Sequence, residues 1–123
     1  MQNQVSMIAR FVAKKISKAE TDKLVEIVVQ ELSVLEGLMG MVLFGSAANY
    51  TMDEASDIDV VMIFESIARA KEASKIVHTL RRQATWPMDI LCIDVNTFNK
   101  KSRVGGVYYI VRREGRTVFG KMP

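Results

Sequence analysis

The apolar residues of this chain recur with two different periods, and the changes of period mark its expected helices and strands. Between residues 18 and 36 they recur every three or four positions, as in an amphipathic helix, and Gly37 is expected to end that helix. Leu38–Phe44 is an unbroken apolar run between glycines and too short for a helix, so it predicts a strand buried on both faces. Residues 57–64 predict a second strand, rich in β-branched side chains.

The same alternation continues through the second half of the chain. Residues 66–84 have helical periodicity, and Pro87 opens a third expected strand, Met88 to Val95. The order helix, strand, strand, helix, strand predicts an α/β (or α+β) domain with a small mixed sheet and helices packed on it. The loop between the first two strands is too short for a crossover helix, so these strands are expected to be antiparallel.

Two regions give weaker signals. Gly105-Gly106 interrupts residues 97–113, where we expect a short helix on each side, and Thr117–Phe119 is expected to form a short last strand. Residues 1–16 form an N-terminal extension that is possibly an amphipathic helix. With 123 residues and no linker, the chain is expected to be a single domain spanning 1–123.

Composition and charge narrow the possible functions. The chain has 17 basic and 14 acidic residues and a net charge of +3. It has no long basic arm, so there is no strong signal for nucleic-acid binding. The charged side chains are expected to lie on the solvated surface. The densest basic positions are Lys100, Lys101, Arg103, Arg112, Arg113 and Arg116. No signal peptide or membrane span is evident, which favours a cytoplasmic protein without a membrane partner. Cys92, the single cysteine, is expected in the core, and His78 on a helix surface.

Two aspartates at the start of the second strand carry the first chemical signal. Asp57 and Asp59 are two residues apart, so their side chains lie on one face of the strand, while Ile58, Val60 and Met62 face a core. Carboxylates placed side by side next to a core repel each other and lose hydration. A divalent cation with a preference for oxygen ligands, such as Mg²⁺, would offset that cost.

Two further features strengthen this signal. Gly45-Ser46 directly follows the first strand, where a glycine permits a sharp turn and the following amides and hydroxyl can donate to phosphate oxygens. Asp89 is an acid inside an otherwise apolar strand, and it would join the pair if the second and third strands are neighbours. Asp94 lies nearer a loop on the opposite side of its strand, and is the weaker candidate for the third acid.

These motifs resemble the signature of the polymerase-beta-type nucleotidyltransferase superfamily, and more narrowly its minimal nucleotidyltransferases (MNT). The resemblance rests on Leu43–Ser46 followed by Ser56–Val60, on Asp89, and on the closing Arg113–Phe119. It implies a nucleotidyltransferase fold and a two-metal mechanism in which Asp57, Asp59 and Asp89 hold two Mg²⁺ ions. Gly45 and Ser46 would hold the nucleoside triphosphate, with ATP as the expected substrate. Asp89 would also help to deprotonate the attacking hydroxyl.

The resemblance leaves three functions open. The chain has no evident room for an acceptor domain, and the short members of the family resemble antitoxins that transfer AMP to a tyrosine of a helical HEPN-type toxin. The first hypothesis is such an AMPylating antitoxin, with a HEPN-type partner and possibly a homo-oligomeric state. The second is a non-catalytic module that neutralises its partner by occlusion. It is kept because Asn49 and Tyr50 replace the arginine and glycine usual in relatives. The third is an antibiotic adenylyltransferase.

Overall fold

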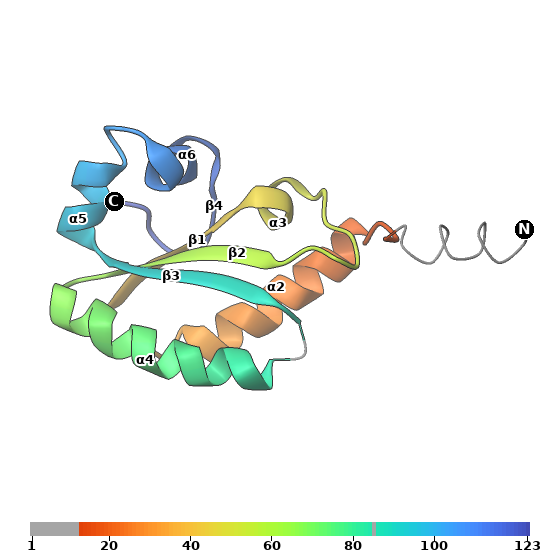
Figure 1. Ribbon diagram of the computed structural model, residues 1–123, viewed down its shortest axis with the longest axis horizontal. Coiled ribbons are helices and arrows are strands. Elements are labelled where there is room, and N and C mark those ends of the chain that lie inside the picture. Colours follow the sequence, from red (N-terminus) through yellow and green to blue (C-terminus); the bar gives the residue numbers. More distant parts are fainter. Residues whose placement is uncertain (1–12, 85) are drawn as a thin grey trace, which may run out of the picture.

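Four strands in one mixed sheet organise the computed structural model, which describes residues 13–84 and 86–123 (Figure 1). The strand order is β3-β2-β1-β4. The elements, in chain order, are α2 (Lys18–Leu32), β1 (Leu38–Phe44), α3 (Gly45–Asn49), β2 (Ile58–Phe64), α4 (Ile67–Gln83), β3 (Met88–Asp94), α5 (Val95–Lys101), α6 (Gly106–Glu114) and β4 (Arg116–Gly120).

The pairing of the strands confirms the expected mixed sheet. β1 pairs antiparallel with both β2 and β4, whereas β2 and β3 are parallel and joined through α4. The parallel pair places the beginnings of β2 and β3 at the same end of the sheet, which is where Asp59 and Asp89 lie. The third strand is therefore the neighbour of the second, as the convergence of the acids requires.

Helices cover both faces of the sheet. α2 and α4 pack on one face, and α5 and α6 lie on the other, at the end where β3 finishes (Figure 1). The larger core forms under α2 and α4 and includes Ile58, Val60 and Met62, as the period-2 pattern of β2 predicts. The smaller core, under α5 and α6, includes Val61, Ile63, Ile93, Phe98 and Val111.

The end of the first helix and the segment after the first strand differ from what the sequence predicts. α2 begins with a capping box between Ser17 and Glu20 but ends at Leu32, earlier than the predicted end, and Gly37 lies in the turn before β1 at φ +77°. Leu35 continues the apolar pattern because it packs against the core from outside the helix. The polar stretch after β1 contains the short helix α3, which the sequence pattern did not indicate.

The N-terminal extension is described only from Ala13 onward, and the rest of its possible helix lies outside the described residues. Lys14 to Ile16 are extended rather than helical. The Ile16 amide donates to the Met52 carbonyl at 3.0 Å, and the Glu54 amide donates to the Lys14 carbonyl at 2.9 Å. Among the described helices, none has the length and apolar character needed to cross a membrane.

Candidate active site

Asp59 and Asp89 occupy matching positions on neighbouring strands. Each is the second residue of its strand, and the parallel register pairs them directly. Alternation along β2 directs Asp59 to the face of the sheet that carries α5 and α6, opposite Ile58 and Val60 in the larger core. The backbone ladder therefore brings these two acids together, without help from any side-chain contact.

Asp57 lies just before β2 and is exposed. Its position is set by the residues on either side of it. The Trp86 indole Nε1 donates to the Ser56 carbonyl at 2.9 Å, and the Ile58 amide donates to the Pro87 carbonyl at 2.9 Å. The segment leading into β3 thus ties the Asp57 loop to the parallel strand pair.

The three acids influence one another electrostatically. Partial burial raises the pKa of Asp59 most, and the negative charges of Asp89 and then Asp57 raise it further. Carboxylate oxygens that destabilise each other's ionised form are suitable ligands for a hard divalent cation, which would relieve the repulsion. Within residues 13–84 and 86–123, no three acidic, histidine or cysteine side chains are arranged so that they could hold a metal ion as they stand. Binding of one metal ion by all three carboxylates would therefore require them to move.

Gly45 joins the Gly-Ser turn to the acids. Phe44 is the register partner of Asp59, so the chain turns away from β1 directly beside that carboxylate. Gly45 has φ +65°, and a Cβ atom there would lie 2.6 Å from Asp59 Oδ2. Both the backbone conformation and the close approach disfavour a side chain at this position. The predicted phosphate-binding turn and the predicted acids therefore form one contiguous site.

Arg116 is a site residue that was not recognised in the sequence. From β4 its Nε donates to the Ala48 carbonyl at 3.1 Å, and its Nη2 donates to the Ala47 carbonyl at 2.9 Å. Its guanidinium also lies over the Tyr50 ring, 4.5 Å from the ring centroid. The only signal in the sequence was its place in the closing motif, which does not indicate contact with residues this far away along the chain.

Two of the basic residues expected on the solvated surface are half-buried instead. Besides Arg116, Arg112 donates to Ser102 Oγ and to Asn99 Oδ1, each at 2.8 Å. An arginine fork can satisfy several fixed acceptors at once, which makes partial burial tolerable. The expectation of a solvated basic surface is therefore wrong for Arg112 and Arg116.

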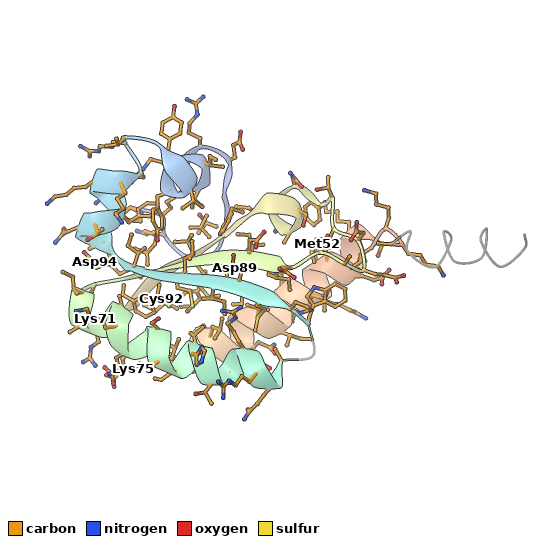
Figure 2. All side chains as sticks on the ribbon, in the orientation of Figure 1. Met52, Lys71, Lys75, Asp89, Cys92 and Asp94 are labelled. Carbon is orange, nitrogen blue, oxygen red and sulfur yellow. The ribbon has the colours of Figure 1, made fainter. Side chains whose placement is uncertain are left out.

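The structure also places the other residues considered as candidates, which are Asp94, Cys92 and His78. Asp94 caps α5 and accepts from the Thr97 amide at 3.0 Å. Hydrogen bonding to the Thr97 side chain, and after it to backbone amides, holds the pKa of Asp94 below its usual range. Asp94 lies at the far end of β3 from Asp89 (Figure 2), about 16 Å away at the usual rise of a strand. Cys92 is half-buried, and burial raises the pKa of its thiol to about 11. His78 is exposed on α4, as expected.

Comparison with known proteins shows the family of the chain. The family model of the nucleotidyltransferase domain matches residues 21–118, and the chain belongs to this family. Among solved structures, the chain is similar to one in the crystal structure of a mutant of the toxin–antitoxin MntA–HpeT. That similarity has 17% sequence identity and a TM-score of 0.44, and it covers 82% of this chain and 73% of that chain. No curated protein matches the chain.

Proposed function

We propose that the protein transfers a nucleoside monophosphate, AMP from ATP, to a hydroxyl acceptor by a two-metal mechanism. The observation that carries this proposal is the contact of Gly45 with Asp59, which is itself in register with Asp89. Membership of the nucleotidyltransferase family supports it as well. The site combines a turn able to bind phosphates with acids able to bind cations, and phosphoryl transfer requires both.

The two parts of the site have different tasks in this reaction. The Gly45-Ser46 turn binds the triphosphate, while Asp57, Asp59 and Asp89 would hold two Mg²⁺ ions. Asp89 accepts the proton of the acceptor hydroxyl. The hydroxyl oxygen forms a bond to the α-phosphorus, the bond from that phosphorus to the bridging oxygen breaks, and pyrophosphate leaves. When bound, the two ions would neutralise the charge that develops on the phosphate oxygens.

For the acceptor, we propose a tyrosine hydroxyl on a HEPN-type toxin, with this protein acting as the antitoxin. Support comes from the resemblance of Leu43–Ser46, Ser56–Val60 and Arg113–Phe119 to the minimal nucleotidyltransferases. An acceptor supplied by a partner protein also suits a site whose described acids lie exposed or half-exposed at one end of a sheet.

The test is an AMP-transfer assay with labelled ATP, Mg²⁺ and the product of the adjacent gene. We expect label on that partner, and we expect Asp57→Asn to abolish it. The matched control is Glu54→Gln, which removes an exposed carboxylate from the same loop and should leave the label unchanged.

Other outcomes would contradict the proposal in distinguishable ways. If the partner is neutralised equally by the wild-type protein and by Asp57→Asn, with label on neither protein, the protein acts by occlusion. If label appears on an added aminoglycoside or lincosamide and not on the protein partner, it is an antibiotic adenylyltransferase.

A further inference from the structure

Four side chains from three parts of the chain surround the end of α3, and we call them the α3 latch. They are Lys18 and Asp22 from α2, Tyr50 at the end of α3, and Arg116 from β4. We propose that the α3 latch positions the Gly45-Ser46 turn for triphosphate binding. This inference rests on the proposed nucleotide-binding function of that turn.

The helix that begins at this turn is too short to be stable on its own. α3 has five residues, and only Ala47 among them is buried. A single helical turn forms few hydrogen bonds for the backbone freedom it loses, so it needs support from outside. Arg116 gives that support by donating to two consecutive carbonyls, at Ala47 and Ala48. The rigid guanidinium fork suits such a pair of acceptors better than a lysine ammonium does.

Tyr50 occupies a backbone position that favours glycine. Its φ of +61° lies in the left-handed region, which is unfavourable for a residue with a side chain. The side chain offsets this cost through three contacts. Lys18 Nζ lies 4.9 Å and Arg116 Cζ lies 4.5 Å from the ring centroid, and the hydroxyl donates to Asp22 Oδ1 at 2.8 Å. The hydrogen bond to Asp22 is the main reason that the pKa of Tyr50 is raised.

The latch is connected to the catalytic acids through the backbone of α3. The amides of Tyr50 and Thr51 both donate to the Ser46 carbonyl. Gly45, the preceding residue, is packed against Asp59. A displacement of Tyr50 would therefore move Ser46 and change the distance between the turn and the acids. Arg116 and Tyr50 are accordingly positioning residues, because they act on the nucleotide through the turn.

The test compares arginines that make similar contacts at different places. Arg116→Ala removes the latch, and Arg116→Lys keeps the charge but not the fork. Arg113→Ala is the matched control. Arg113 donates to the Tyr109 hydroxyl and lies 5.4 Å from that ring's centroid, on the exposed side of α6. Binding of ATP and of AMP is measured by calorimetry with Mg²⁺, and folding is checked by circular dichroism.

We expect Arg116→Ala to weaken ATP binding about tenfold, the loss typical of removing a charge-assisted hydrogen bond. The lysine variant should lie in between, and the Arg113 control should equal wild type. AMP binding should change much less, because AMP lacks the β- and γ-phosphates held by the turn. In turnover, KM for ATP should rise while kcat at saturation changes less. Equal ATP affinity of Arg116→Ala and wild type would overturn the proposal.

A second variant tests the latch in a protein that is expected to fold. Tyr50→Gly removes the cost of the left-handed backbone conformation, so it should fold, yet it should bind ATP several-fold more weakly. Unchanged ATP binding by this variant would also overturn the latch. If the wild-type protein itself binds no ATP, the proposed function fails, and the latch fails with it. If the wild-type protein binds ATP but these variants bind it equally well, only the latch fails.

Discussion

The two halves of the site are held in place by different kinds of interaction. In the carboxylate half, Asp59 and Asp89 are fixed by the hydrogen-bonded register of two adjacent strands. In the phosphate half, Gly45–Tyr50, the backbone is held mainly by the side chains of other elements, Arg116 above all. A backbone ladder is independent of side-chain identity, whereas a latch depends on a few particular residues. The carboxylate half should therefore tolerate substitutions of the residues around it better than the phosphate half does.

The largest effect is expected in the carboxylate half, from a variant that lacks the carboxylate of Asp59. Asp59→Asn should reduce nucleotidyl transfer at least about 100-fold, because losing even an outer-shell partner of a metal commonly costs 10- to 100-fold. The same variant should be more stable than wild type at neutral pH, since burial and the charges of Asp89 and Asp57 disfavour ionised Asp59. Thermal unfolding with and without Mg²⁺ measures this, and Mg²⁺ should stabilise the wild type only.

The pH dependence of the free energy of unfolding tests whether ionised Asp59 destabilises the fold. The pKa of Asp59 is raised in the folded state, so its favourable contribution to the free energy of unfolding is complete below its unfolded pKa. That contribution is lost as the pH rises through the folded pKa. The stability advantage of Asp59→Asn should therefore be largest at neutral pH and shrink on acidification. A variant less stable than wild type at neutral pH would show that the carboxylate makes net favourable contacts.

A smaller effect is expected where the two halves meet. Gly45→Ala should destabilise the fold by about 1–2 kcal/mol for its left-handed backbone, with a further loss from the clash with Asp59. Gly106→Ala is the matched control. Gly106 has φ +75°, but its added Cβ would meet no atom within 4 Å. Denaturant unfolding and the transfer assay should show the larger loss of stability, and the only loss of activity, for Gly45→Ala. Equal losses of stability and activity in both variants would show that the clash with Asp59 does not couple the two halves.

The smallest effect concerns Asp57, the one acid outside the strand ladder. Trp86→Phe removes the hydrogen bond to the Ser56 carbonyl and should cost about 0.5–1.5 kcal/mol, with a few-fold decrease in transfer rate. Tyr109→Phe removes a comparable side-chain bond on α6, to Arg113, and should leave the rate unchanged. A normal rate in Trp86→Phe would show that Asp57 is positioned without this tether.

The sequence predicted the strands well because local patterns specify them. Leu38–Phe44 was bounded correctly by its flanking glycines, and the period of two placed Asp59 on the face opposite Ile58 and Val60. The mixed sheet also followed from a loop too short for a crossover helix. Membership of the nucleotidyltransferase family was evident from the Gly-Ser and Asp-x-Asp motifs.

What the sequence did not reveal depends on contacts between distant residues. α3 is a single turn with no room for a helical period, so Gly45–Asn49 read only as a polar loop. The pairing of Asp59 with Asp89 requires knowing which strands are neighbours. Arg116 looked like one of several surface cations, and its role emerges only when β4 pairs with β1. The roles proposed for the three acids and for Gly45-Ser46 remain predictions for the experiments above.

The position of Arg116 also has a consequence for biosynthesis. Arg116 follows Ala48 by 68 residues, so the ribosome completes Gly45-Ser46 and all three acids long before it adds the residue that secures α3. A nascent or prematurely terminated chain that stops before β4 would carry every catalytic motif and still lack the support for its triphosphate-binding turn. Under the proposed function, nucleotide use would then begin only after translation has passed the last strand, so incomplete copies would transfer nothing.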